Sequence, residues 1–209
     1  MHDLNKAPPS APRHPIELDW FAAARRSLQE VNARLIELLA SAAENPVECL
    51  PLATQFRDLI EPMDPAARAR VTSCPYLLVD AGFQDPMRWS RAAAQTEAVG
   101  ATTPCFPRAQ AIELAHMTLL LAWTLVHVNR TGAGLLLGVS PACAEIIANL
   151  KLQEMQRIAT DYCGWARPRW ENRPEVWRRL LSAANSADAR ALNELGLQGL
   201  RLFFGELLP

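Results

Sequence analysis

The segment 108–128 limits the possible folds more than any other part of the chain. Apolar residues cover nearly every face of the helix that it predicts and leave only a thin polar stripe. These apolar residues are Ile112, Leu114, Leu119, Leu121, Trp123, Leu125 and Val126. Such a helix must lie at the centre of a core or in a subunit interface. Because the run also contains Glu113, His116 and His127, we interpret it as a buried helix and not as a membrane span.

Helical spacing recurs through the rest of the chain. From Ile16 to about Ala43, apolar residues repeat every three or four positions and charged residues fill the opposite face, which predicts an amphipathic helix. Further helices are predicted from Pro51 to about Ile60, from Pro65 to Arg70 after Asp64, from Met87 to about Val99 after Asp85-Pro86, and after Ser186 to about Leu207. Gly196 and Gly199 interrupt the last helix, which suggests a close approach of another helix.

Short helical runs follow one another between Leu135 and Leu181. Gly138 is expected to close a helix in the left-handed conformation, after a turn that follows the central helix. Ser140-Pro141 starts the next helix, and a turn at Leu150-Lys151 separates it from a third run that reaches Tyr162. These two short helices have the lengths seen in helix-turn-helix units.

The chain shows no pattern for a sheet. Residues 74–80 form an apolar run, but a single strand would have no partner, so we interpret the run as a buried connector. The expected fold class is therefore all-α: a multi-helix orthogonal bundle with a central apolar helix and a helix-turn-helix-like segment. We expect a disordered tail over 1–15, an N-terminal helical region over 16–100 and a second region over 107–209, with one continuous domain as the alternative.

The composition argues against catalysis and against a bound metal or other cofactor. The five cysteines include no C-x-x-C pair, and His116 and His127 would stand roughly 16 Å apart along one helix, too far to bind one ion. No histidine is near Cys163 in the sequence, so a buried thiol is the expected state. The glycines at 132, 134 and 138 lack the spacing and the preceding strand of a phosphate loop. No signal peptide is recognisable, which predicts a cytoplasmic protein.

A tryptophan- and arginine-rich segment follows the short helices. Trp165, Trp170 and Trp177 are expected to be core residues, while Pro168 keeps the neighbouring backbone extended. The arginines have two alternatives: exposure toward phosphate or carboxylate groups of a partner, or pairing with Glu171, Glu175 or helix ends. The candidate residues for contact with DNA or a partner are Gln153, Gln156, Arg157, Arg167, Arg169, Arg173 and Arg178.

Residues 111–181 resemble the D subunit of the bacterial flagellar master transcription regulator, FlhD. The resemblance lies in Leu119-Leu120-Leu121-Ala122, in Leu137-Gly138-Val139, in the run from Ala144 to Leu152, and in Gln156-Arg157-Ile158-Ala159. The sequence departs from the family at Arg167-Pro168-Arg169-Trp170, and its first hundred residues have no counterpart. The resemblance implies an all-α dimer that acts with a second, zinc-bearing subunit on promoter DNA. This chain lacks the cysteine cluster of that subunit.

Two classes of function follow. The first is a regulatory subunit that binds duplex DNA or a second regulatory protein. The second is a non-enzymatic protein-interaction adaptor or secretion-associated chaperone with no role on nucleic acid. A homodimer is expected in either case, because the central helix and the glycine-interrupted helix expose more apolar surface than a monomer of 209 residues covers easily.

Overall fold

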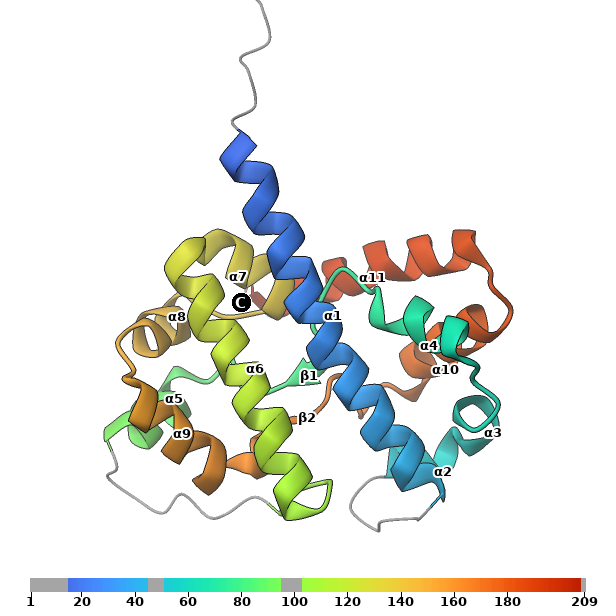
Figure 1. The fold of residues 1–209 in the computed structure, drawn as a ribbon, viewed down its shortest axis with the longest axis horizontal. Helices are drawn as coiled ribbons and strands as arrows, with labels where there is room; N and C mark the ends of the chain where they lie inside the picture. The colour runs from blue at the N-terminus through green and yellow to red at the C-terminus, as the bar shows by residue number, and fades with distance from the viewer. Residues whose placement is uncertain (1–14, 45–50, 95–102, 208–209) are drawn as a thin grey trace, which may run out of the picture.

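The computed structural model describes residues 15–44, 51–94 and 103–207. Eleven α-helices, one 3-10 helix and a pair of two-residue strands make up these residues, which confirms the expected all-α class. Residues 1–14 of the predicted tail lie outside the described residues, and Pro15 begins the first helix. Figure 1 shows two groups of short helices with the long helices α1 and α6 in front of them.

Helix α1 (Pro15–Glu44) agrees with the predicted amphipathic helix. Leu28, Val31 and Leu35 are buried, whereas Arg25, Arg26 and Glu30 are exposed. The buried stripe contains one polar residue, Asn32, with no exposed surface. Its side chain accepts a hydrogen bond from the amide of Leu78 at 2.8 Å and donates to the carbonyl of Tyr76 at 3.0 Å, so it ties α1 to the connector 74–80.

The next four helices are α2 (Pro51–Gln55), α3 (Arg57–Ile60), α4 (Pro65–Thr72) and α5 (Pro86–Ala94). The single helix predicted over 51–60 is wrong, because Phe56 leaves helical geometry (φ −115°) and buries its ring completely. The helix starts predicted at Asp64-Pro65 and at Asp85-Pro86 are confirmed. Asp64 accepts a hydrogen bond from the amide of Ala67 at 2.6 Å, and Asp85 accepts one from that of Arg88 at 2.9 Å. The predicted end of α5, at about Val99, lies outside the described residues.

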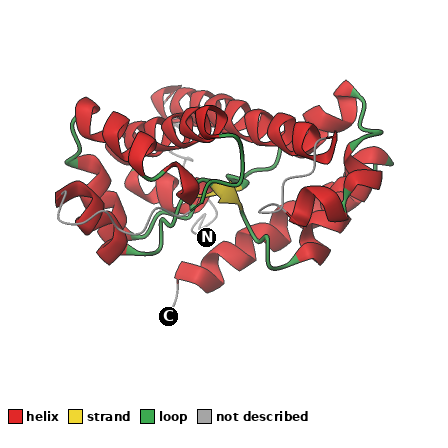
Figure 2. Cartoon of the chain, turned by 90° about the horizontal axis from the view of Figure 1, so that it is seen from below, coloured by secondary structure: helices red, strands yellow, loops and turns green. Residues whose placement is uncertain are grey.

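The connector 74–80 is buried as expected, but the expectation that it has no strand partner is wrong. Val79–Asp80 forms strand β1, which pairs antiparallel with β2 (Arg167–Pro168) in the register Val79 to Pro168 and Asp80 to Arg167. In Figure 2 this strand pair lies at the centre of the molecule, beneath the layer of long helices. Because β2 lies far from β1 in the sequence, no local sequence pattern predicts that the two strands pair.

Helix α6 (Arg108–Val128) has the predicted bounds and the predicted central place. It packs against α1, α7, α8 and α9. Within the described residues it is the single unbroken helix long and apolar enough for a membrane span, and the bent pair α7–α8 passes the same test. Half of the apolar window of α6 is buried inside the protein, and the place of the helix in the core accounts for that half.

Three short helices follow: α7 (Arg130–Leu137), α8 (Pro141–Ala148) and α9 (Leu152–Asp161). The segment after the central helix is thus helical where a turn was expected. Gly138 closes α7 with φ 71°, which confirms its left-handed role. Helices α7 and α8 meet at 116°, and the 3-10 helix η1 (Cys163–Trp165) leads from α9 to β2.

The last two helices are α10 (Pro174–Asn185) and α11 (Ala189–Leu207). The start signal at Ser186 is wrong: Ser186 ends α10, and Asp188 caps α11 by accepting a hydrogen bond from the amide of Ala191 at 2.9 Å. The glycines do mark a close approach, but the segment that approaches them is the connector 74–80 and not another helix, as was predicted. A Cβ at Gly199 would fall 2.3 Å from ring atoms of Tyr76, and one at Gly196 would fall 3.4 Å from Pro75.

The two predicted helical regions interleave in space. Helix α5 packs against α8 and α9, whereas α10 packs against α3 and α4. A single hydrophobic cluster contains residues from both regions. A boundary between 100 and 107 stays a prediction, and a part of that segment lies outside the described residues.

Candidate nucleic-acid and partner interface

Helices α8 and α9 are the two short helices joined by a short turn that the sequence predicts. Helix α8 packs against α5, α6 and α7, and α9 packs against α5 and α6, so a helix-turn-helix arrangement stays a prediction. Ser140 caps α8 by accepting a hydrogen bond from the amide of Cys143 at 3.2 Å. Three residues, from Asn149 to Lys151, separate the two helices. The amide of Lys151 then donates to the carboxylate of Glu154 at 2.7 Å, which fixes the start of α9. The turn has the length found in helix-turn-helix units.

Helix α9 has one buried and one exposed face. Met155, Ile158 and Ala159 are buried on the side that packs against α6. Gln153 and Gln156 are exposed on the other side, and Leu152 beside them is 68% exposed. The two glutamines therefore present their amide groups to solvent from one helix face, which is what contact with base edges or with a partner requires.

Arg157 is less available than the two glutamines. Its guanidinium donates to the carbonyl of Ala92 on α5 at 2.8 Å and lies 3.8 Å from the carboxylate of Asp161. The side chain is about a quarter exposed. Arg157 thus ties α9 to α5, and a contact role for it stays a prediction.

Arg169 does not have the exposure that a contact role needs. It is 3% exposed, and its guanidinium donates to the carbonyls of Leu77 at 3.1 Å, Val79 at 3.1 Å and Leu137 at 2.9 Å. The planar group with five N–H donors suits three backbone acceptors around it. Arg169 therefore joins β1, β2 and the end of α7. Of the two predicted alternatives, pairing with a helix end is found for Arg169, and exposure toward a partner is wrong.

The three tryptophans are core residues, as predicted. Trp165, Trp170 and Trp177 are at most 7% exposed, and the indole of Trp177 donates to the carbonyl of Arg169 at 2.7 Å. Trp170 adopts φ 54° at the turn after β2, where its carbonyl accepts from the amide of Arg173 at 2.8 Å. The guanidinium of Arg88 lies 4.1 Å from the ring centroid of Trp165, and burial lowers the pKa of Arg88.

The other candidate arginines lie apart from α9. Arg167 is paired with Glu171 at 2.9 Å, which is one of the two predicted alternatives. Arg173, the residue directly before α10, is exposed. The guanidinium of Arg178 on α10 lies 5.0 Å from the ring centroid of Phe56. Because α10 packs against α3, α4 and α11 while α9 packs against α5 and α6, the seven candidates do not form one surface (Figure 1).

The described residues offer no site for metal or thiol chemistry. They contain no group of three or more histidine, cysteine or carboxylate side chains that could hold a metal ion. His116 is half-buried and His127 is exposed. Cys74, Cys105, Cys143 and Cys163 are buried, and burial raises the pKa of the Cys74 thiol to about 12. Burial also raises the pKa of Cys143. A thiol with a raised pKa is a poor nucleophile.

The carboxylates Glu113 and Glu145 do not meet. Glu113 pairs with Arg34 at 2.6 Å, and Glu145 pairs with Arg130 at 2.5 Å. Each therefore belongs to a separate surface ion pair.

The comparisons with known proteins point to one family. Residues 108–198 match the FlhD family, the flagellar transcriptional activator. The match confirms the resemblance seen over 111–181 and extends it from the start of α6 into α11. It includes the α8–turn–α9 unit and leaves α1 to α5 outside. No curated protein and no solved structure matches the chain.

Proposed function

We propose that the chain is a subunit of a transcription regulator of the flagellar activator type, which acts as a homodimer with a second regulatory protein on duplex DNA. The observation that supports this most is the FlhD match over 108–198, which contains a helix pair with an exposed polar face on its second helix. We expect a regulator of this type to be located in the cytoplasm. An enzymatic role is not proposed.

In this proposal α9 contacts DNA. The amide groups of Gln153 and Gln156 suit the bidentate recognition of adenine in the major groove, and Lys151 at the start of the helix adds a positive charge for phosphate. The helix carries few positive charges, so affinity from α9 alone is modest. A second regulatory protein would supply further contacts.

The arginines outside α9 serve a different purpose in the proposal. Arg173 and Arg178 are exposed near α10, away from α9, and are assigned to the second protein or to distant phosphates. Arg167 and Arg157 are already engaged in ion pairs, so they contribute less. Arg169 is left out because it is buried.

The alternative is a protein-interaction adaptor or secretion-associated chaperone without a nucleic-acid role. The observation that favours it is the exposure of single large apolar side chains, of which Leu152 at 68% and Leu197 at 61% are examples. Leu152 stands beside the two glutamines of α9, so the same face suits a protein partner. The two functions differ in whether duplex DNA is bound.

The test is selection of DNA fragments from the genome that encodes the protein, with the full chain alone and with cell extract. For an enriched fragment, fluorescence anisotropy would then give Kd as a function of salt. Replacing Gln153 and Gln156 together with alanine should weaken specific binding by about tenfold or more, because each bidentate contact with a base contributes about 1–3 kcal/mol.

The matched control is Gln55→Ala, which removes another exposed glutamine on α2. It should leave Kd unchanged. If no fragment is enriched with or without extract, the adaptor alternative holds. If binding occurs but the double variant binds as tightly as the wild type, DNA is contacted elsewhere.

A further inference from the structure

An apolar groove of about 310 Å³ runs between α1 and α6. Trp20, Ser27 and Glu30 line it from α1, and Leu120, Thr124 and Val128 line it from α6. The helices run antiparallel, because Arg34 pairs with Glu113 at one end while the ring of Trp20 lies against Gly132, just after α6, at the other.

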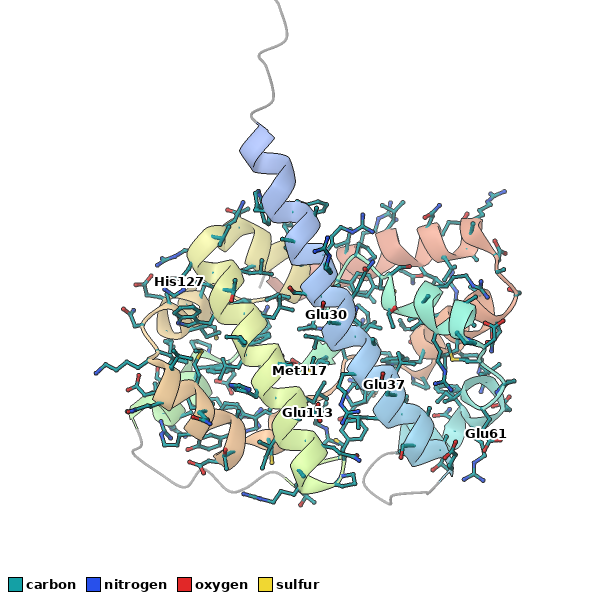
Figure 3. All side chains as sticks on the ribbon, viewed as in Figure 1. Glu30, Glu37, Glu61, Glu113, Met117 and His127 are labelled. Carbon is teal, nitrogen blue, oxygen red and sulfur yellow. The ribbon has the colours of Figure 1, made fainter. Side chains whose placement is uncertain are left out.

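The apolar side chains of this groove are only partly covered. Leu120 is 41% exposed and Val128 is 58% exposed, and Met117 one turn before Leu120 is partly buried. Figure 3 shows Met117 on α6 and Glu30 on the neighbouring part of α1. Residues 117, 120, 124 and 128 recur every three or four positions on α6, so they form one stripe that another helix can cover.

The charges beside the groove indicate what covers it. On the exposed side of α1, Ala23, Arg26, Glu30 and Ala33 are spaced symmetrically about the level of residue 28. If a second α1 lies antiparallel across the first at that level, Arg26 of each copy faces Glu30 of the other, and alanine faces alanine. Arg26 and Glu30 are exposed and have no ion-pair partner among the described residues. This stripe is complementary to itself, as a two-fold interface requires.

We propose that the α1–α6 groove is the interface between two copies of this chain. Its walls come from both parts of the sequence, since α6 lies inside the FlhD match and α1 lies outside it. The proposal rests on the homodimer of the proposed function and adds its location. The apolar stripe on α6 provides burial, the alanines permit close approach, and Arg26 and Glu30 set the antiparallel register.

Charge reversal tests the interface by sedimentation equilibrium of the full chain. Arg26→Glu places a carboxylate opposite Glu30 at two points of the dimer, and Glu30→Arg places a second guanidinium opposite Arg26. Each change should raise the dimer dissociation constant by about tenfold or more. The double variant, Arg26→Glu with Glu30→Arg, should return to the wild-type value. An equimolar mixture of the two single variants should form a heterodimer, because all its facing charges are opposite.

Leu120→Glu should also dissociate the dimer, because it places a charge in the apolar stripe. Arg91→Glu, which reverses an exposed charge on α5, should have no effect. Circular dichroism and Tm of each variant check that the fold is kept. A dimer that neither single reversal weakens, or a double variant as weak as the single ones, would overturn this interface.

The failure of this inference is distinguishable from the failure of the proposed function. A dimer insensitive to these changes leaves the proposed homodimer intact and moves its interface elsewhere. A wild-type chain that is monomeric at high micromolar concentration removes the homodimer and the interface together. Binding of DNA through Gln153 and Gln156 is measured separately and is decided by neither result.

Discussion

The central hydrogen-bonded arginine offers the sharpest test of what holds the fold together. Replacing Arg169 with methionine keeps much of the side-chain volume but removes the three guanidinium bonds to the carbonyls of Leu77, Val79 and Leu137. The bond from the amide of Arg169 to the carbonyl of Leu78, at 2.7 Å, remains. The substitution therefore leaves three buried acceptors without these donors.

The expected loss follows from those three bonds. A hydrogen bond to a charged group contributes about 1.5–3 kcal/mol, but burial of the guanidinium itself costs several kcal/mol, so the sum of the bonds overstates the effect. We expect Arg169→Met to lower the free energy of unfolding by about 3–5 kcal/mol, because each of the three buried carbonyls left without a donor costs about 1–3 kcal/mol and removal of the buried charge offsets a part of that loss. Arg169→Lys should lower it by less, because an ammonium group satisfies some of the acceptors.

Urea unfolding followed by tryptophan fluorescence and by circular dichroism measures this loss. The control is Arg167→Ala, two residues away in the same segment. It breaks a partly exposed pair with Glu171 and should cost no more than about 1 kcal/mol. If Arg169→Met is within about 1 kcal/mol of the wild type, the three bonds do not stabilise the fold, and our account of the segment around β2 fails.

Two further predictions concern Gly199 and the buried thiols. Gly199→Ala should lower the unfolding free energy by about 1–3 kcal/mol and reduce Tm, because the new Cβ would fall 2.3 Å from the Tyr76 ring; Gly134→Ala, whose Cβ would come no nearer than 3.5 Å to Val139, is the control and should hold or raise Tm. A Tm for Gly199→Ala at or above the wild-type value would show that α11 lies further from Tyr76 than described. Burial raises the pKa of the Cys74 thiol from its ordinary 9.0 to about 12, so the unfolded chain releases this proton first. The contribution of the Cys74 thiol to stability is therefore fully present below pH 9 and is lost as the pH rises toward 12. When urea unfolding is measured at several alkaline pH values, this part of the fall in stability should disappear in Cys74→Ala. An identical pH dependence in that variant would rule out Cys74 as a source of the effect.

Helix ends were predictable because their causes are local. Asp64, Asp85 and Ser140 each accept a bond from a backbone amide three residues later, and Gly138 takes the left-handed conformation that few other residues adopt. The apolar period located α1, and the long apolar run located α6. The helix start predicted at Ser186 was wrong because Asp188, two residues later, provides the capping carboxylate.

Contacts between distant segments were not predictable from local patterns. The pairing of β1 with β2, the bonds of Asn32 to the connector and the burial of Arg169 all join residues more than 30 positions apart. An arginine between two tryptophans looks the same in the sequence whether it faces solvent or the core. Of the candidate residues, the exposure of Gln153 and Gln156 was predictable, because the exposed face of α9 follows from its helical period.

The groove between α1 and α6 was also not visible before the fold was known. Its two walls come from helices about a hundred residues apart, and each apolar stripe alone is typical of a core helix. The symmetric charges of Arg26 and Glu30 are a signal in the sequence, but they gain meaning only once α1 is known to be exposed on that side.

The most direct test of a regulatory role is chromatin immunoprecipitation of the tagged full chain in the cell that encodes it. The account predicts enrichment at a limited set of promoter regions, loss of that enrichment in the double variant Gln153→Ala with Gln156→Ala, and its retention in Gln55→Ala at equal protein level. Absence of enriched promoters for the wild-type chain, or the same promoters at the same occupancy in the double variant, would contradict the assignment of α9 as the helix that contacts DNA.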